Sequence, residues 1–573
     1  MNKIPSRSDF CIIGGNAVGA KTAATLARRL PTATITLFEK GNNLSYATCG
    51  LPYFASGDVD SFAELTKTAY GVARTADFFL NSKGFQAVTG AEIIGINRQQ
   101  KSVVVKMVQN GEICEHSYGK LVLATGAKPR RPRFPIPESP NIRFFTGPED
   151  AIAFRRKAEK GEIDTVAIVG GGLIGCELAE AMRGMWGINT ILLEKENQLL
   201  PSVLDPEISA IVKKEMIQNK VDVITGATIE GIKSLNGDSR LVLDFDGENL
   251  EADFVFLCLG VEPESTLAQD CGLNLGRSGG IIVDNFMRTS DPDIYAGGDC
   301  VETHQLISGK PVFFPMGSLA NRHGRIIAEN LAGANVEFPG VLGAFLVKIF
   351  DLNVGGVGLT EKAAPQDGFN PRAVWGSFPD KPDYYPENKA LTLKMVYAQD
   401  DSRLLGMQAA GTGDICRRID VFSSFLQNHS KVKDLFDFEH GYAPPYAEAL
   451  DPLHHMAAIA EIQESGIDFI NPGGPFENNI FWLDVREIEE AAAEPFDLAQ
   501  MGITGTVLNI PLNELTNRLG ELNCAMKIVL LCKRGPRAYQ AALILKRAGF
   551  CDIHILAAGV TAIGAVNSGK RRQ

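Results

Sequence analysis

Two glycine-rich turns, each placed between a short apolar strand and a helix, constrain the fold of this chain more than any other feature. The first follows Phe10–Ile13 and is Gly-Gly-Asn-Ala-Val-Gly at 14–19. The next strand ends at Glu39. Glycines permit a tight turn, the helix N-terminus faces a pyrophosphate, and the acid accepts hydrogen bonds from ribose hydroxyls. A dinucleotide-binding fold is predicted, although Asn16 replaces the middle glycine.

The second copy of the pattern is stricter. Val166–Val169 leads into Gly-Gly-Gly-Leu-Ile-Gly at 170–175, and the following strand ends at Glu194. An acid at that point accepts hydrogen bonds from a free ribose 2′-hydroxyl and repels a 2′-phosphate. NADH is therefore favoured over NADPH as the ligand of this second fold.

Three further segments indicate that the second fold is inserted into the first. The chain leaves the first fold at 123–127, returns at 259–263, and ends another strand at Asp299. This order resembles the flavoprotein disulfide reductases with two dinucleotide-binding domains. The resemblance implies FAD in the first fold, NAD(P)H in the inserted fold, and Asp299 on the flavin ribityl chain. The residues expected at FAD are Gly14, Asn16, Ala17, Gly19, Glu39, Lys40, Thr125, Gly126 and Asp299; those expected at NADH are Gly170, Gly172, Ile174, Gly175, Glu194 and Gly260.

Cys49 lies just past the first dinucleotide unit, in Ser-Tyr-Ala-Thr-Cys-Gly-Leu-Pro-Tyr at 45–53. Most disulfide reductases carry a Cys-x-x-x-x-Cys pair beside the flavin, but the next cysteine of this chain is Cys114. A lone cysteine cannot close an internal disulfide with a neighbour. It can form a mixed disulfide with a substrate, a persulfide or a sulfenic acid. Gly50 and Pro52 indicate a turn or helix start, which favours a thiolate over a buried, inert thiol.

The run around Cys49 resembles the coenzyme A-disulfide reductase branch of these flavoproteins, as do 383–386 and 442–446. In that branch two tyrosines of the dimerisation domain reach the redox cysteine of the other subunit, which implies a homodimer. Tyr442 occupies one position; the other is Tyr384 or Tyr385, and we favour Tyr384. A phenol near sulfur can protonate a departing thiolate. Without the resemblance, a core or interface aromatic accounts for these tyrosines equally well.

The same resemblance implies coenzyme A contacts around the first helix and Cys49. Cations suit coenzyme A because it carries a pyrophosphate and a 3′-phosphate, although cations here could equally be solvated surface charges. One position differs, because Leu450 stands where the family commonly has a lysine, so one phosphate partner is missing. The implied residues are Lys21, Thr25, Arg28, Ser45, Thr48, Lys83 and Asn321.

A second reactive thiol is expected at Cys532, which an apolar strand at 528–531 delivers to Cys-Lys-Arg-Gly-Pro-Arg, ahead of an amphipathic helix. Backbone N–H groups around the sulfur and nearby cations stabilise a thiolate or persulfide anion. This Cys-x-x-Gly-x-Arg loop, with Leu-Asp-Val-Arg-Glu at 483–487, resembles a rhodanese domain. The segment 557–560 departs from that family's Gly-Gly-x-x-x-Trp/Tyr stretch. The loop residues expected at the sulfur donor are Lys533, Arg534, Gly535 and Arg537.

These segments predict an α/β protein with a NAD-binding Rossmann-like domain inserted in a FAD-binding one, an α+β dimerisation domain and a rhodanese α/β domain. The expected boundaries are 1–145 and 266–334 for the FAD domain, 146–265 for the NAD domain, 335–464 for the dimerisation domain, 465–479 for a Pro/Gly/Asn-rich linker and 480–573 for the rhodanese domain.

Composition excludes several other classes of function. The net charge of −12 and pI near 5.4 argue against a nucleic-acid partner. No apolar run approaches the ~20 residues of a membrane span, and the N-terminus lacks the core of a signal peptide. Eleven cysteines contain no Cys-x-x-Cys pair, so neither zinc nor a dithiol is indicated. A reducing cytoplasm fits this cysteine usage best.

The sequence thus favours an NADH-dependent, FAD-containing persulfide, polysulfide or coenzyme A-disulfide reductase that uses Cys49, with sulfane sulfur relayed by Cys532. A rival within the enzymes is an NADH oxidase or peroxidase that cycles Cys49 through sulfenic acid, but oxygen chemistry has no use for a rhodanese domain. A rival of another class is a sulfur-delivery protein that acts mainly through Cys532.

Overall fold

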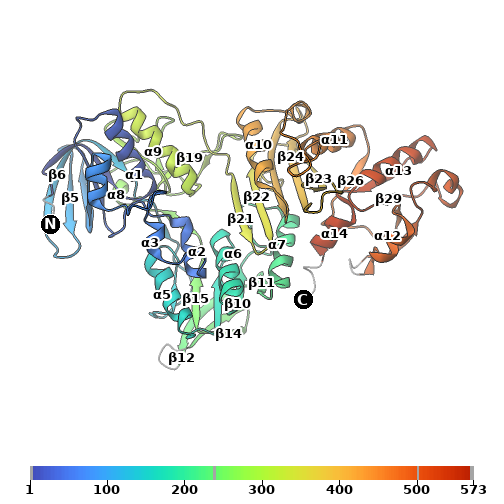
Figure 1. The fold of residues 1–573 in the computed structure, drawn as a ribbon, viewed down its shortest axis with the longest axis horizontal. Helices are drawn as coiled ribbons and strands as arrows, with labels where there is room; N and C mark the ends of the chain where they lie inside the picture. The colour runs from blue at the N-terminus through green and yellow to red at the C-terminus, as the bar shows by residue number, and fades with distance from the viewer. Residues whose placement is uncertain (1–3, 236–239, 500–502, 568–573) are drawn as a thin grey trace. The chain divides into compact units, whose positions relative to one another are not determined.

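The computed structural model describes residues 4–235, 240–499 and 503–567. The chain divides into two compact units, whose elements are labelled along the ribbon in Figure 1. The first comprises residues 1–170, 181–190 and 228–341, and the second comprises 171–180, 191–227 and 342–573. The second glycine turn therefore stands at a boundary between the units, which divide immediately after Gly170.

The first unit contains a sheet in the strand order β3-β2-β1-β6-β5-β4. Strands β3, β2, β1 and β6 run parallel, whereas β5 and β4 are antiparallel additions. The long strand β6 pairs with β5 through its first half and with β18 through its last three residues. The bounds are β1 Arg7–Ile13, β2 Ile35–Glu39, β3 Gln86–Thr89, β4 Ala91–Asn97, β5 Ser102–Met107, β6 Ile113–Leu123 and β18 Ile294–Ala296.

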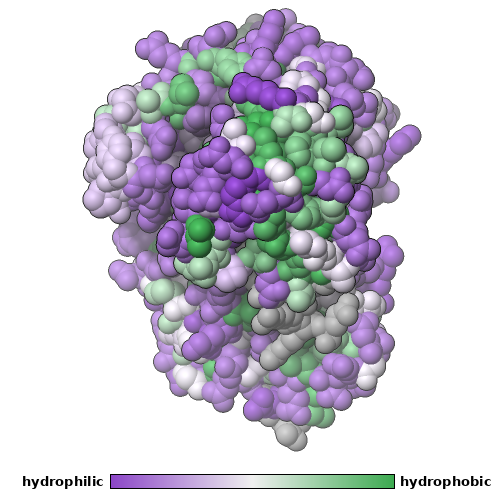
Figure 2. Space-filling view, turned by 90° about the vertical axis from the view of Figure 1, so that its right-hand side faces the viewer, coloured by the Kyte–Doolittle hydropathy of each residue, from purple (hydrophilic) through white to green (hydrophobic). Residues whose placement is uncertain are grey.

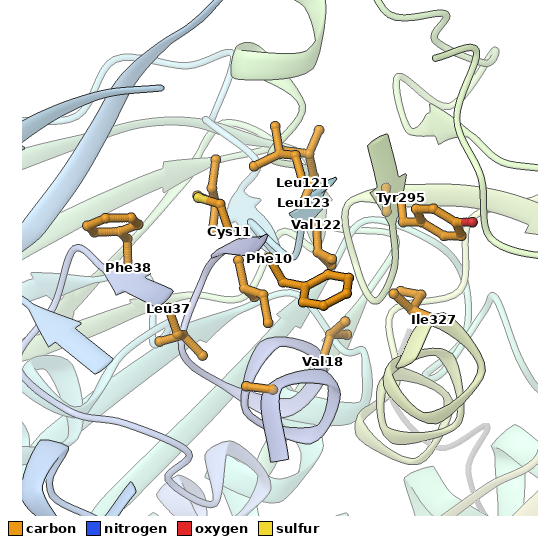
Figure 3. Packing of buried hydrophobic residues seen from close by; sticks show 14 of the residues in the cluster. Phe10, Cys11, Val18, Leu37, Phe38, Leu121, Val122, Leu123, Tyr295 and Ile327 are labelled. Carbon is orange, nitrogen blue, oxygen red and sulfur yellow. The ribbon is translucent and has the colours of Figure 1, made fainter. Parts of the chain in front are cut away.

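The core of this sheet is closed by two helices, α1 (Ala17–Arg29) and α9 (Gly317–Leu331), which pack against each other. Val18 of α1 and Ile327 of α9 lie close to the residues of β1 and β6 in Figure 3. The side chains of strand β6 at this end, 121–123, are fully buried. Continuous apolar runs suit strands covered on both faces, so the first glycine turn sits on a rigid base.

The chain leaves this fold and returns to it through two paired strands. Strand β7 (Ala127–Pro129) and strand β16 (Val261–Pro263) form an antiparallel two-stranded sheet. Between them, β8 (Ile142–Arg143), β15 (Phe254–Leu257) and β9 (Thr165–Val169) are parallel in the first unit, and β10 (Asn189–Glu194) and β11 (Asp222–Thr225) are parallel in the second. This topology is that of one fold inserted into another.

Other elements of these folds are shorter or peripheral. The antiparallel strands β12 (Ile229–Leu235), β13 (Arg240–Phe245) and β14 (Glu248–Ala252) form one sheet, and β17 (Ile281–Ile282), β19 (Val301–His304) and β20 (Pro311–Val312) form another. The helices are α2 Leu51–Ser56, α3 Phe62–Leu65, α4 Ala76–Phe78, α5 Pro148–Glu159, α6 Leu173–Glu180, α7 Pro206–Gln218 and α8 Thr266–Asp270.

The second unit contains an antiparallel sheet in the order β21-β22-β25-β24-β23. Its helices are α10 (Cys416–Gln427), which packs on β22 and β25, and α11 (Pro452–Glu464), which packs on β23. The strands are β21 Phe345–Ile349, β22 Leu352–Gly358, β23 Pro371–Pro379, β24 Ala390–Ala398 and β25 Leu404–Gly411.

A buried ion cluster surrounds Lys394 of β24, whose side chain is 1% exposed. Its Nζ lies 2.9 Å from Asp205, 3.2 Å from Glu207 and 2.7 Å from Glu361. Asp205 also accepts hydrogen bonds from Gln408 and from the backbone N–H of Glu361. A buried charge is tolerated only when it is paired and hydrogen-bonded, and this cluster meets both conditions.

The C-terminal part of the second unit is a parallel sheet in the order β26-β30-β29-β27-β28. Its bounds are β26 Asp468–Ile470, β27 Ile480–Asp484, β28 Gly505–Asn509, β29 Ile528–Leu531 and β30 Ile553–Leu556. The helices are α12 Ile488–Ala493, α13 Pro536–Arg547 and α14 Gly559–Asn567, seen around β29 in Figure 1.

The expected linker at 465–479 differs from a plain connector, because β26 within it pairs with β30 as an edge strand of this sheet. The polar, Gly- and Pro-rich composition of this segment gave no sign of the three-residue strand β26. The remaining linker is fixed as well, because Asn471 donates a hydrogen bond to Glu207 at the start of α7. The expected α/β class is confirmed, because parallel and antiparallel sheets with packed helices make up both units.

Among the helices that the structure describes, none combines the length and the apolar character needed to cross a bilayer. The surface turned to the viewer in Figure 2 is mostly hydrophilic, with hydrophobic residues gathered in a narrower band.

Candidate active site

The first glycine turn has no room for a side chain at Gly14 or Gly19. Gly14 lies at φ +104°, and a Cβ there would be 2.1 Å from the carbonyl oxygen of Ala124; a Cβ on Gly19 would be 1.8 Å from that of Gly14. Asn16, at the irregular position, is intermediate in exposure and donates a hydrogen bond to Thr48 at 2.8 Å. Asn16 therefore connects the dinucleotide turn to the segment that carries Cys49.

The acids after both dinucleotide turns are held in the same way. Glu39 Oε2 accepts the N–H of Gly15 at 2.7 Å, and Glu194 Oε2 accepts the N–H of Gly171 at 2.6 Å. In each case the other carboxylate oxygen accepts an N–H two residues further along the chain. The carboxylates are thus fixed beside the turns as ribose acceptors must be. Lys40, by contrast, forms a 2.7 Å ion pair with Glu92.

The second glycine turn is crowded at Gly170 and open at Gly172. A Cβ on Gly170, at φ +111°, would be 2.2 Å from the carbonyl oxygen of Cys258, whereas a Cβ on Gly172 would meet no protein atom within 4 Å. Gly172 is therefore the point where a ligand's pyrophosphate can approach the backbone, at the start of α6. Ile174, two residues further along, is exposed, and Gly175 is buried.

The crossings between the two folds carry the other predicted contacts. Thr125 donates its hydroxyl to the carbonyl of Glu264 at 2.5 Å, and Gly126 accepts the N–H of that residue at 2.9 Å. Gly260, at φ +85°, accepts the N–H of Arg130. A Cβ on either of these glycines would meet no protein atom within 4 Å, so both leave space for a ligand.

Asp299 follows β18 and is partly buried, which raises its pKa to about 6. His323 of α9, one of the eight histidines for which the sequence indicates only a structural or surface role, accepts the N–H of Gly298 at its Nδ1 atom, at 3.1 Å. Burial lowers the pKa of His323 to about 3, so its ring is neutral and Nε2 carries the proton beside the Phe338 ring, 4.5 Å away between centroids. His323 thereby fixes the turn that presents Asp299.

Cys49 lies in a short 3-10 turn, Thr48–Gly50, that leads directly into α2, with Pro52 in the first turn of the helix. Its side chain is exposed, and its sulfur is 3.7 Å from the Cβ position of Gly317 at the start of α9. Asn321, one turn along α9, donates a hydrogen bond to the carbonyl of Gly317. The expected helix start at the cysteine is thus present, and Cys114 lies apart on β6.

A pocket of about 270 Å³ lies on α1 and α9 and is rich in cations. It contains three of the residues that we expected to contact coenzyme A and three that sequence reasoning missed. Four of the six are basic, so an anionic group suits the pocket. The lining residues are Lys21, Thr25, Arg28, Arg29, Arg325 and Glu329.

The other expected coenzyme A contacts lie elsewhere in the first unit. Thr48 is at the Cys49 turn, and Ser45 accepts a hydrogen bond from Arg74 through its carbonyl at 2.6 Å. The Lys83 ammonium lies 5.4 Å from the centre of the Phe78 ring and does not line the pocket. Leu450 is exposed in the second unit.

The structure brings Tyr384 and Tyr442 together and leaves Tyr385 out of the pair. Tyr384 and Tyr442 are both exposed, and their hydroxyls are hydrogen-bonded. Desolvation, followed by the neighbouring Tyr442 oxygen, raises the pKa of Tyr384, so it remains a proton donor. The Tyr385 ring faces the ammonium of Lys381 at 5.9 Å.

Cys532 directly follows β29 and is 1% exposed. Its sulfur accepts the backbone N–H of Gly535 at 3.1 Å, and α13 begins at the next residue, Pro536. Gly535 has φ +122°, a conformation that disfavours a side chain. The loop therefore directs an N–H group and a helix start at the sulfur, as expected.

Two of the loop cations are already paired. Arg537 forms two 2.7 Å hydrogen bonds to Glu490, which lower the pKa of that carboxyl. Arg534 donates to both carboxylate oxygens of Asp383, each at 3.0 Å. Lys533 is exposed. Sequence reasoning assigned all three to the sulfur donor and did not foresee these acidic partners.

The segment 557–560, which differs from the family pattern, contacts the Cys532 loop through its backbone. Val560 donates its N–H to the carbonyl of Cys532 at 3.0 Å, and a Cβ on Gly559 would be 2.4 Å from the same oxygen. Ala558 is left at φ +56°, in the left-handed region that favours glycine. The departure from the family pattern is therefore local.

Glu177 of α6 is a further group that sequence reasoning missed. It follows the second glycine turn, and burial, together with Glu180, raises its pKa to about 7. Groups with strongly raised pKa values cluster at functional sites, and Glu177 stands two residues after Gly175 of the second glycine turn. Its position directly after the fingerprint could have pointed to it.

Family models match three parts of the chain. The model described as pyridine nucleotide-disulphide oxidoreductase matches residues 8–315, and its dimerisation-domain companion matches 345–454. The chain belongs to this family. Its members use FAD and a nicotinamide dinucleotide, and both glycine turns with their fixed acids fit these cofactors. A model described as rhodanese-like domain matches 475–565, which includes the Cys532 loop.

Individual relatives of this family member are also informative. An NAD(P)H sulfur oxidoreductase (CoA-dependent) of Pyrococcus furiosus is 33% identical over 78% of this chain and 98% of its own length. An NADH oxidase of Methanocaldococcus jannaschii is 30% identical over the same shares. The solved structure of an NAD-dependent persulfide reductase from A. fulgidus is 35% identical, covers 96% of this chain and 99% of its own, and has a TM-score of 0.91.

Proposed function

We propose that this chain is an NADH-dependent, FAD-containing reductase of persulfides, polysulfides or coenzyme A disulfide, and that its rhodanese domain supplies sulfane sulfur. The observation that carries the proposal is the conjunction of an exposed redox cysteine whose next cysteine in sequence is Cys114 with a second thiol in a rhodanese loop. The similarity to a persulfide reductase over nearly the whole chain supports it.

Cys49 is the nucleophile of the reductase reaction. Its thiolate attacks the outer sulfur of a persulfide R–S–SH; the S–S bond breaks, a new one forms to Cys49, and RS⁻ leaves. Attack on coenzyme A disulfide instead gives a mixed disulfide with Cys49 and a coenzyme A thiolate. NADH and FAD, held at the two glycine turns, would supply the two electrons that convert the Cys49 persulfide to a thiolate and hydrosulfide. No second protein thiol is needed, consistent with the sequence around Cys49.

Tyr384 and Tyr442 donate the protons. The hydrogen bond between their hydroxyls holds the pair together, and the raised pKa of Tyr384 keeps it protonated at neutral pH. A protonated phenol can give its proton to the departing thiolate. The dimerisation domain that carries them supports a homodimer in which the pair serves the cysteine of the other subunit.

The cationic pocket on α1 and α9 holds the phosphates of coenzyme A. Lys21 and Arg28 of α1 and Arg325 of α9 all line this pocket. Arginine and lysine pair with phosphate through charge-assisted hydrogen bonds. Glu194 excludes a 2′-phosphate at the second dinucleotide turn, so NADH is the reductant.

Cys532 carries sulfane sulfur between donors and the reductase. Its thiolate attacks thiosulfate or polysulfide, the donor's S–S bond breaks, and Cys532–S–S⁻ forms while sulfite or a shorter polysulfide leaves. The Gly535 N–H stabilises the anion. This chemistry needs reduced thiols, which favours a cytoplasmic location.

The deciding experiment compares Cys49→Ser with Cys524→Ser, a change of another exposed cysteine. Cys49→Ser should lose coenzyme A persulfide turnover while NADH still reduces the flavin in a stopped-flow measurement, and Cys524→Ser should retain both. Persulfide turnover in Cys49→Ser would refute the proposal. If NADH alone drove oxygen consumption as fast as persulfide is turned over, the chain would instead act as an NADH oxidase, the name that one relative bears. Cyanide-linked sulfur transfer far faster than NADH-linked sulfide release would favour a delivery protein.

A further inference from the structure

An ion pair joins the rhodanese loop to the tyrosine segment of the dimerisation domain. Nη1 of Arg534, two residues after Cys532, lies 3.0 Å from both carboxylate oxygens of Asp383. Asp383 directly precedes Tyr384, which is hydrogen-bonded to Tyr442. Residues 151 positions apart thus place the two chemical centres of the second unit side by side.

Both ends of this pair are rigidly supported. On the rhodanese side, Arg534 stands between Cys532 and Gly535, whose sulfur and N–H are hydrogen-bonded. On the other side, the backbone carbonyl of Asp383 accepts a hydrogen bond from Asn388, and the N–H of Tyr385 donates to Pro382. The pair therefore joins two turns whose backbones are themselves hydrogen-bonded.

A second acidic side chain, Glu448, lies near Arg534 in addition to Asp383. Glu448 lies close enough to Asp383 and Arg534 to feel both charges: burial and then Asp383 raise the pKa of Glu448, and Arg534 lowers it. Arg534 thus faces an acidic surface formed by the segments that flank both tyrosines. Arg537, by contrast, is paired within its own domain through Glu490.

We propose that Arg534 and Asp383 are positioning residues that hold the Cys532 loop beside the Tyr384–Tyr442 pair, so that sulfane sulfur leaves the rhodanese domain next to the reductase's proton donors. The inference rests on the proposed function. In the transfer, an acceptor thiolate attacks the outer sulfur of Cys532–S–S⁻; that S–S bond breaks, a new one forms, and Cys532 leaves as a thiolate. Electrons are neither gained nor lost.

The test measures three rates in the full-length holoenzyme. The coupled rate is NADH oxidation with thiosulfate and coenzyme A, which needs both thiols. The direct rate is NADH oxidation with coenzyme A persulfide, and the transfer rate is thiocyanate formation from thiosulfate and cyanide. Asp383→Asn should lower the coupled rate roughly two- to fivefold, the range that an exposed ion pair supports, and leave the direct and transfer rates unchanged.

Two variants and one solution condition sharpen the test. Asp383→Glu should restore coupling, because it keeps the charge. Glu477→Gln is a matched control: it breaks the Lys527–Glu477 pair of the same domain, whose side chains are 30% and 70% exposed, against 29% and 67% for Arg534 and Asp383. Rising salt should lower wild-type coupling towards the Asp383→Asn value, because screening weakens exposed pairs. Amide exchange in 532–537 should accelerate in Asp383→Asn only.

The outcomes separate the two claims. A wild-type protein without direct persulfide turnover refutes the proposed function, and the positioning role with it. Normal wild-type turnover with equal coupled rates in Asp383→Asn and wild type refutes the positioning role alone. An equal fall of all three rates in Asp383→Asn also refutes it, because that result indicates a general structural defect.

Discussion

Gly172→Ala offers a clean separation of folding from cofactor binding. A Cβ at this position meets no protein atom within 4 Å, and Gly172 does not have the positive φ of Gly170. Alanine should therefore fold without strain and stabilise the chain by about 0.4–1 kcal/mol, because it restricts the unfolded state. The same methyl group occupies the space through which the NADH pyrophosphate approaches the backbone.

The magnitude follows from the crowding that the methyl introduces. Inserting a methyl group into a closely packed contact costs about 1–3 kcal/mol, which corresponds to a roughly fivefold to hundredfold weaker Kd for NADH. FAD content should be unchanged, because the first glycine turn is untouched. The assay is the NADH dependence of flavin reduction in stopped flow, together with thermal unfolding of the same preparation.

Gly170→Ala is the contrasting variant, because its Cβ would lie 2.2 Å from a carbonyl oxygen at φ +111°. That protein should lose stability as well as NADH binding. If Gly172→Ala bound NADH as tightly as wild type, the assignment of this turn to the nicotinamide dinucleotide would be untenable.

Three further changes test the structure more broadly. Lys394→Met should lower the free energy of unfolding by about 3–5 kcal/mol, measured in urea, because it leaves buried acids unpaired; an effect below about 1 kcal/mol would contradict the buried cluster. Glu177→Gln should stabilise the protein at pH 8 by about 3 kcal/mol. Because the pKa of Glu177 is raised on folding, its contribution to stability is present below pH 4.5 and is lost as the pH rises towards 7. Thermal unfolding of the variant, measured across this range, should lack that pH dependence. Ala558→Gly should stabilise the rhodanese domain by about 1 kcal/mol by relieving a left-handed alanine. Fluorine NMR of fluorotryptophan at the buried Trp482 follows unfolding of that domain, and an unchanged midpoint would contradict the backbone strain.

The sequence predicted those parts of the site whose interacting residues lie close together along the chain. Both dinucleotide turns were predicted because the strand, the glycines and the acid are close in sequence, and at Gly19 the clash that requires glycine is also local, with the carbonyl oxygen of Gly14. The Cys532 loop followed for the same reason, since its sulfur is bound by an N–H three residues away. The predicted strand at 528–531 is β29.

Contacts between distant segments could not be predicted in this way. The adjacent tyrosines at 384 and 385 left two candidates in the sequence, with Tyr384 favoured. In the fold Tyr384 is hydrogen-bonded to Tyr442, while the carbonyl of Tyr385 accepts a hydrogen bond from Asn388. The acidic partners of Arg534 and Arg537 come from other elements, so the loop looked more cationic in sequence than it is in the fold. Strand β26 is too short to leave a period in a polar segment.

The ion cluster of Lys394 complicates any attempt to express one domain of this protein without the others. Two of its acids, Asp205 and Glu207, lie at the start of α7, and the third, Glu361, lies in the loop after β22. Separating the inserted fold from the dimerisation sheet would therefore leave Lys394 with Glu361 alone and deprive Asp205 and Glu207 of their cation. Neutral residues at 205 and 207 would remove this unpaired charge from an excised fragment. Failure of an unmodified fragment would then reflect a severed charge network and not a missing catalytic part.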